Sequence, residues 1–127
     1  MRNWILVVED EDEIREALVD ILNESGFTAI GRASAVEAFN VIVETPPALV
    51  LSDINLGDHN GGELLDMAMK ILGPDAPPFV FVTGLPASDI TGVPRSARIL
   101  RKPVDVDTLL DVATTYCRRA PGIPTVA

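Results

Sequence analysis

The residues of this sequence best suited to chemistry are polar side chains that end four apolar runs. An apolar run of this length predicts a strand buried on both faces of a parallel sheet. Ligands bind at the carboxyl edge of the strands in an open α/β sheet. We therefore expect carboxylates, a hydroxyl and an ammonium group to meet at one edge, where they could hold a divalent cation and a phosphoryl group. The runs are residues 5–8 ending in Glu9 and Asp10, 48–51 followed by Asp53, 79–82 ending in Thr83, and 99–100 followed by Lys102.

Each of these residue types has a place in phosphoryl-transfer chemistry. Mg²⁺ prefers hard oxygen ligands, which Asp10 would supply directly and Glu9 either directly or through water. Asp53 is placed to be both a metal ligand and a nucleophile, because a carboxylate that attacks phosphorus gives an acyl phosphate. Lys102 would neutralise charge on the transferring group, and Thr83 would donate a hydrogen bond to it. Singly each residue is a weak signal, so their order and shared edge carry the prediction.

Strand and helix patterns alternate between these signals. Five strands alternating with helices predict an α/β fold with a doubly wound parallel sheet. The second strand is short and is expected near an edge. Ser34 and Glu37 have the spacing of a capping box and predict a helix start. The expected strands are residues 5–8, 27–30, 48–53, 79–83 and 98–101, and the last helix is expected over about 105–119.

The unit after the fourth strand is irregular. Gly84, Pro86, Gly92 and Pro94 interrupt it. Proline removes a backbone donor and restricts the residue before it. The sequence therefore predicts that the fourth helix is missing or reduced to a single turn within residues 87–91.

Composition sets the broad class of the protein. The chain has 127 residues and a net charge of −9, which predicts one domain and argues against nucleic acid as a direct ligand. Cys117 is the only cysteine, so no intrachain disulfide is possible and a reducing compartment is expected. No apolar stretch has the length of a membrane span, and we expect a cytoplasmic protein. Residues 1–119 are expected to form the domain and 120–127 a flexible tail.

The constellation resembles the response-regulator receiver domain of two-component signalling, over residues 3 to about 119. The matching stretches are 5–12 with the acidic pair, 51–56 around the phosphoacceptor, Thr83-Gly84 and Lys102-Pro103. The resemblance implies a flavodoxin-like fold and a single-domain response regulator. Such a protein is not an enzyme on other substrates, since it catalyses only its own phosphorylation and dephosphorylation.

The resemblance also implies a role for each matching residue. Asp53 would accept a phosphoryl group from a sensor histidine kinase or a phosphotransfer protein. Mg²⁺ would be held by Glu9, Asp10, Asp53 and the backbone carbonyl of Asn55. Thr83 and Lys102 would bind phosphoryl oxygens, and the peptide bond between Lys102 and Pro103 would be cis, which is otherwise uncommon. Output would pass through an unidentified downstream protein or through a role as a phosphate sink.

Two departures from the family pattern bear on the output. Residues 78–84 resemble a subgroup with the motif Pro-Phe-x-Phe-Ala-Thr-Gly-Tyr, with Val82 and Leu85 in place of the alanine and tyrosine. Ile99 occupies the position of a switching aromatic residue, and an isoleucine has no ring with a polar tip to swing. The expected two-state element is instead the loop 84–94, ordered when Thr83 engages the phosphoryl group.

Three other readings compete with this one. A calcium-binding loop beginning at Asp53 would place Leu64 at its twelfth position, where a glutamate is needed. An aspartyl-phosphate phosphatase of the haloacid dehalogenase type would have a second acid at the position of Asn55. A non-phosphorylated pseudo-receiver that acts only as an interaction module stays open as the alternative.

Overall fold

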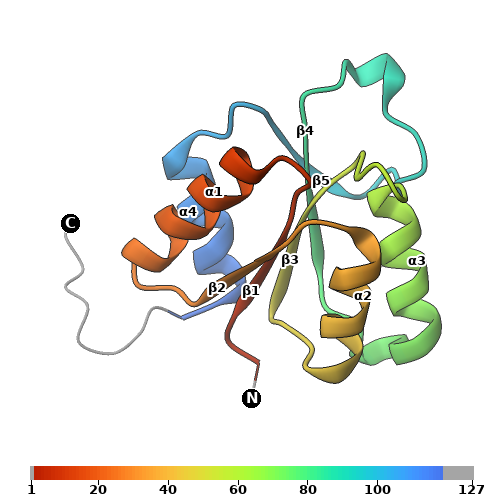
Figure 1. Ribbon diagram of the computed structural model, residues 1–127, viewed down its shortest axis with the longest axis horizontal. Coiled ribbons are helices and arrows are strands. Elements are labelled where there is room, and N and C mark those ends of the chain that lie inside the picture. Colours follow the sequence, from red (N-terminus) through yellow and green to blue (C-terminus); the bar gives the residue numbers. More distant parts are fainter. Residues whose placement is uncertain (1, 119–127) are drawn as a thin grey trace.

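The computed structural model describes residues 2–118, and the tail expected at 120–127 lies outside them. Its five strands form one parallel sheet in the order β2-β1-β3-β4-β5. Helices cover both faces, with α1 and α4 on one and α2 and α3 on the other (Figure 1), so the predicted doubly wound fold is confirmed. The strands are β1 (Ile5–Val8), β2 (Ala29–Arg32), β3 (Leu49–Asp53), β4 (Phe79–Thr83) and β5 (Arg98–Arg101). The α-helices are α1 (Asp12–Glu24), α2 (Ala35–Glu44), α3 (Gly61–Leu72) and α4 (Val106–Tyr116), and the short 3-10 turns are η1 (Gly73–Asp75) and η2 (Ala87–Asp89).

The central strands are buried on both faces, as their apolar runs predict. Side chains of β1 alternate between the two layers: Ile5 and Val7 join the core under α1 and α4, and Leu6 and Val8 join the core under α2 and α3. All four are at most 1% exposed. This burial fixes the register of β1 and β3, because a slip by one residue would move every side chain to the opposite core.

The second strand begins two residues later than the sequence pattern suggests. Phe27 is buried but belongs to the turn that ends α1, where its backbone N–H donates to Leu22 O. Gly26 supplies the positive φ of +95° that this turn needs. Asn23 then pairs through its side-chain amide with both backbone groups of Ala29 and so sets the start of β2. β2 lies at the edge of the sheet, as expected.

Helix starts follow their capping residues. Ser34 accepts a hydrogen bond from Glu37 N at the start of α2, the predicted cap. Asn60 and Glu63 form a reciprocal capping box at the start of α3. Two apolar residues of these helices are exposed, Val36 at 52% and Ile71 at 61%. In both cases the small residues Ala35, Ala38 and Ala68 make the close contacts with the sheet.

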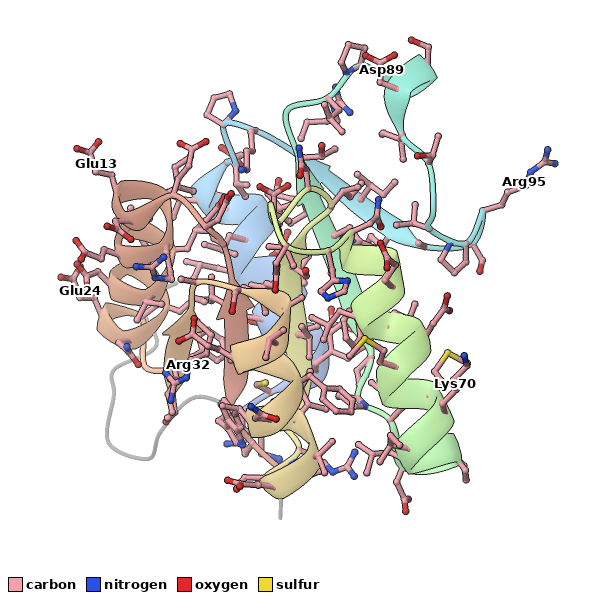
Figure 2. All side chains as sticks on the ribbon, turned by 45° about the vertical axis from the view of Figure 1, so that its right-hand side comes forward. Glu13, Glu24, Arg32, Lys70, Asp89 and Arg95 are labelled. Carbon is pink, nitrogen blue, oxygen red and sulfur yellow. The ribbon has the colours of Figure 1, made fainter. Side chains whose placement is uncertain are left out.

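The connection from β4 to β5 carries no α-helix. It contains only the 3-10 turn η2 (Ala87–Asp89), the single turn that the glycines and prolines predict. The connection stands away from the end of the sheet (Figure 1), and Asp89 and Arg95 point outward from it (Figure 2). Within residues 2–118, none of the helices combines the length and apolar character needed to cross a bilayer.

Candidate functional site

The predicted residues lie at the strand ends, at the point where the strand order of the sheet reverses. β2 lies on one side of β1 and β3 on the other. The connections that leave β1 and β3 therefore run to opposite sides of the sheet, and open α/β sheets bind ligands in the crevice between two such strands. Glu9 and Asp10 follow β1, and Asp53 ends β3. Thr83 ends β4 and Lys102 follows β5. The shared sheet edge inferred from the sequence is therefore the arrangement that the structure has.

Lys102 is the centre of the ionic contacts at this edge. Its Nζ donates to Glu9 Oε1 at 2.5 Å and to Asp53 Oδ2 at 2.8 Å. The side chain of Lys102 is 18% exposed and that of Asp53 is 11% exposed, so both bonds are shielded from solvent. Burial lowers the pKa of Lys102, but the hydrogen bonds from Lys102 to Asp53 and Glu9 outweigh it and raise that pKa above 10.5. The ammonium group therefore stays charged and offsets one of the carboxylates.

Glu9 is a buried acid held in place from two directions. Only 2% of its surface is exposed. Burial raises the pKa of Glu9 from 4.5 to about 7, although the hydrogen bond from Lys102 acts in the opposite sense. The negative charge of Asp53 raises that pKa further. Arg15 on α1 donates to Glu9 O at 2.8 Å and fixes the backbone at the end of β1.

The carboxylates at this edge fit a divalent cation. Glu9, Asp10 and Asp53 each offer one oxygen, and the three oxygens lie within 4.8 Å of one another. These are the hard ligands that Mg²⁺ accepts, and Mg²⁺ commonly takes one or two carboxylates while keeping several waters. Asp10 is exposed and Asp53 is half-buried, so solvent reaches the group from one side. The residues therefore fit the ion that the sequence suggests.

Thr83 and Asn55 line the hollow above these carboxylates. The hollow measures about 260 Å³ and is also lined by Asp10, Asp53 and Lys102. Thr83 is buried, and its hydroxyl accepts a hydrogen bond from Leu85 N at 3.0 Å. The backbone N–H of Asn55 donates to Asp53 Oδ1 at 3.2 Å. The peptide bond between Lys102 and Pro103 is cis.

Glycine is required behind the Asp53 loop. Gly61 N donates to Ile54 O at 2.6 Å, and a Cβ on Gly61 would lie 2.4 Å from Asp53 O. No side chain fits that space. The start of α3 can therefore pack directly against the end of β3, which holds the turn after Asp53 in shape.

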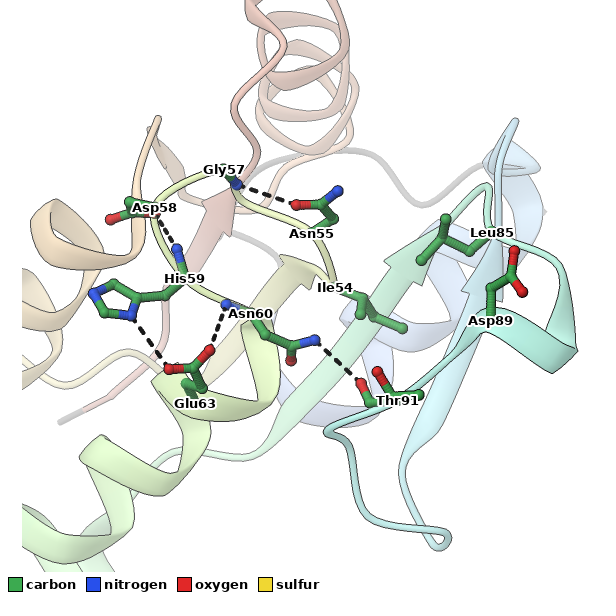
Figure 3. Close-up of a pocket in the computed structure, with 10 residues that line it drawn as sticks. All are labelled: Ile54, Asn55, Gly57, Asp58, His59, Asn60, Glu63, Leu85, Asp89 and Thr91. Atoms are coloured by element: carbon green, nitrogen blue, oxygen red, sulfur yellow. Dashed lines mark hydrogen bonds and ion pairs between the residues drawn. The ribbon is translucent and has the colours of Figure 1, made fainter.

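A second, more polar cavity adjoins the hollow. It measures about 400 Å³ and lies between the loop after β3 and the β4–β5 connection (Figure 3). The side chain of His59, which lines this cavity, is 39% exposed and pairs with Glu63 at 3.3 Å. Asn55 and Leu85 line this cavity as well as the hollow above Asp53. These two residues therefore form the partition between the two spaces.

Sequence reasoning missed two residues that support the site. Arg15 holds the backbone of Glu9 and also pairs with Asp12 at 2.5 Å; the acid-to-arginine spacing on α1 was the available signal. Asp58 accepts hydrogen bonds from Ala35 N and Val36 N and so caps α2 from another loop. Nothing in the local sequence signals that contact, because its partners lie 22 and 23 residues away.

Comparisons with known proteins agree with this geometry. A family model described as the response regulator receiver domain matches residues 5–114. The response regulator receiver protein CpdR of Brucella abortus is 31% identical over 110 residues, covering 84% of this chain and 90% of that protein. Sporulation initiation phosphotransferase F of Bacillus subtilis is 26% identical, covering 91% and 94%. A CheY-like receiver domain from Methanospirillum hungatei superposes with a TM-score of 0.75 at 30% identity, covering 91% of this chain and 93% of that one.

Proposed function

The chain belongs to the response regulator receiver domain family, and from this premise we propose that it is a single-domain response regulator phosphorylated on Asp53. The observation that carries the proposal is the double contact of Lys102 Nζ with Asp53 and Glu9, beside the carboxylate of Asp10. The donor would be a sensor histidine kinase or a phosphotransfer protein. Two relatives of similar length support a stand-alone role, CpdR and a sporulation phosphotransferase.

In the proposed reaction the protein supplies the nucleophile and the surrounding charge. One carboxylate oxygen of Asp53 attacks phosphorus, an acyl-phosphate bond forms, and the bond from phosphorus to the donor nitrogen breaks. Glu9, Asp10, Asp53 and the carbonyl of Asn55 would hold Mg²⁺. When bound, the ion supplies positive charge next to the phosphoryl oxygens. Asn55 N–H already donates to Asp53 Oδ1 and restrains the carboxylate before the reaction.

Lys102 and Thr83 would change partners as the phosphoryl group arrives. Lys102 Nζ now donates to Asp53 Oδ2, and it would transfer that bond to a phosphoryl oxygen while keeping Glu9. Thr83 now accepts from Leu85 N, and its hydroxyl would turn to donate to the phosphoryl group. The start of the β4–β5 connection therefore responds to phosphorylation, which makes this connection the proposed two-state element. The resulting signal would pass to a downstream protein in the cytoplasm, or the protein would act as a phosphate sink.

Beryllofluoride, which imitates a phosphoryl group on aspartate, tests this site without a cognate kinase. We expect beryllofluoride with Mg²⁺ to shift the backbone amide resonances of Asn55, Thr83 and Leu85 in the wild type. Asp53→Asn should abolish the shifts, and Asp66→Asn, an exposed acid on α3, should leave them unchanged. The alternative is a pseudo-receiver that is never phosphorylated. That alternative gains support if neither beryllofluoride nor acetyl phosphate produces any change that depends on Asp53.

A further inference from the structure

Among the described residues 2–118, a single side-chain hydrogen bond ties the β4–β5 connection to an element other than the strands that it joins. Within residues 2–118, the other hydrogen bonds of residues 84–96 stay inside the connection or reach Thr83 at its start. The exception is Asn60, whose Nδ2 donates to Thr91 O at 3.1 Å (Figure 3). The middle of the connection, which runs from residue 84 to residue 97, is therefore held on the N-terminus of α3.

Two glycines allow the backbones to approach closely at this contact. A Cβ on Gly62 would lie 1.7 Å from Gly92 O, so only glycine fits there. Gly92 has a φ of +79°, a conformation that glycine adopts without strain. Atoms of the Asn60 side chain would lie 3.1–3.2 Å from a Cβ on Gly92. The glycines thus bring the carbonyl of Thr91 within reach of Asn60.

The oxygen and the nitrogen of the Asn60 side-chain amide make two separate hydrogen bonds. Its Oδ1 accepts from Gly62 N at 2.6 Å and caps α3. An aspartate would cap the helix equally well, since Asn and Asp rank together at this position. The donor Nδ2 is needed only for the bond to Thr91, because a carboxylate has no hydrogen to give. The cap and the bond to Thr91 can therefore be separated by one substitution.

The start and the middle of the connection are both attached to residues beside Asp53. Thr83 begins it, and Asn60 forms an antiparallel bridge with Asn55 in the loop that follows Asp53. Between these two attachment points lies Leu85, which with Asn55 forms the partition between the Asp53 hollow and the second cavity. If the attachment at Thr91 were lost, Leu85 would be free to move and the two spaces would merge.

We propose that Asn60 is a positioning residue that acts through Thr91. Its hydrogen bond holds the connection on α3 and keeps Leu85 as a wall against water. This inference rests on the proposed function, because the step that it slows is hydrolysis of the acyl phosphate. In that step a water oxygen attacks phosphorus and the bond from phosphorus to Asp53 breaks. The carboxylate of Asp53 is regenerated, inorganic phosphate leaves, and one proton of the water passes to solvent.

Three substitutions separate the contact from the helix cap. N60D keeps the cap and removes the donor to Thr91. G62A leaves Asn60 intact but adds a methyl group that collides with Gly92 O. E63A is the matched control, because it removes the other half of the capping box and leaves the bond to Thr91 in place.

The first readout is the amide order parameter in the unphosphorylated protein without Mg²⁺. We expect order parameters of about 0.85 at Thr91 and Gly92 in the wild type and E63A, and below about 0.6 in N60D and G62A. Unchanged order parameters in N60D would overturn the proposed contact. This measurement does not depend on phosphorylation, so its outcome is distinct from failure of the proposed function.

The second readout is the decay of acyl phosphate after loading with acetyl phosphate and Mg²⁺. We expect decay several-fold faster in N60D and G62A than in E63A and the wild type. Equal decay rates, with lowered order parameters, would show that Asn60 holds the connection but does not protect the phosphoryl group, which overturns the positioning role. If the wild type forms no acyl phosphate, the proposed function fails and the positioning role fails with it.

Discussion

At the scale of single residues, the ammonium group of Lys102 determines the charge balance of the site. It bonds two carboxylates at once, one of them on a residue that is 2% exposed. A buried carboxylate without a partner costs free energy, and part of that cost is relieved when the group takes up a proton. The pKa of Glu9 is raised to about 7, so this residue takes up a proton far more readily than an ordinary glutamate. Lys102 therefore stabilises the fold as well as the proposed reaction.

Replacing Lys102 by methionine tests this double role. We expect Lys102→Met to lower the free energy of unfolding at pH 8 by about 2 kcal/mol, because Glu9 loses its partner. The loss should be smaller at pH 5, where Glu9 can be protonated. Urea unfolding measures both values. Arg101→Met is the control, because Arg101 is exposed next to Lys102; equal stability of the two variants at pH 8 would contradict the assigned role.

At the scale of elements, the loop between β3 and α3 makes hydrogen bonds to two segments outside the sheet, α2 and the β4–β5 connection. Asp58 caps α2 from this loop, and Asn60 holds the β4–β5 connection. Desolvation is the largest single effect and raises the pKa of Asp58, but the hydrogen bonds from Ala35 N, Val36 N and His59 N together outweigh it and hold that pKa below 3.8. The loop that follows Asp53 is thus braced on both sides.

The cap formed by Asp58 predicts a dependence of stability on pH. The folded-state pKa lies below the unfolded value of 3.8. The contribution of Asp58 is therefore fully present above that pH and is lost as pH falls through the folded-state pKa. Asp58→Ala should destabilise the protein by about 1 kcal/mol at pH 7, and the difference from the wild type should shrink below about pH 4. Chemical denaturation across pH measures this, with Asp66→Ala as an exposed control; a difference that stays constant with pH would argue against the cap.

Sequence patterns predicted the elements well where local signals and burial agree. The bounds of β4 and β5 match the expected ones. Each strand contains a short apolar run next to prolines or charged residues, which limit where the strand can begin and end. The start of β2 was wrong by two residues, since Phe27 is buried by the turn that ends α1 rather than by the sheet. The contact of Asp58 with α2 could not be predicted, because it depends on which loops the folded sheet brings together. The strand-end residues were predictable because parallel strands have one carboxyl edge.

At the scale of the whole molecule, the negative net charge of the chain adds to the local negative charge of the carboxylates at the sheet edge. The chain carries a net charge of −9, and three of its carboxylate oxygens converge within 4.8 Å. Lys102 offsets only part of that local charge. Repulsion within the site therefore favours uptake of a divalent cation, and binding to the folded state alone would stabilise it.

Magnesium should raise the stability of the wild type by mass action. At a free Mg²⁺ concentration of about 100 times Kd, we expect a gain of about 2.7 kcal/mol in the free energy of unfolding. EDTA should reverse the gain, and Asp10→Asn should remove most of it. Asp20→Asn, an exposed acid on α1, should respond as the wild type does. A gain of equal size in both variants would mean that Mg²⁺ acts on the general surface charge and not at this site.

The central claim is that Asp53 carries the phosphoryl group, and chemical trapping tests it most directly. The protein is incubated with acetyl phosphate and Mg²⁺, the acyl phosphate is reduced with borohydride, and the modified residue is located by peptide mass spectrometry. We predict reduction at Asp53 alone, dependent on Mg²⁺ and absent from Asp53→Asn. Reduction at another carboxylate, or none in a protein that a cognate kinase also fails to label, would contradict the account.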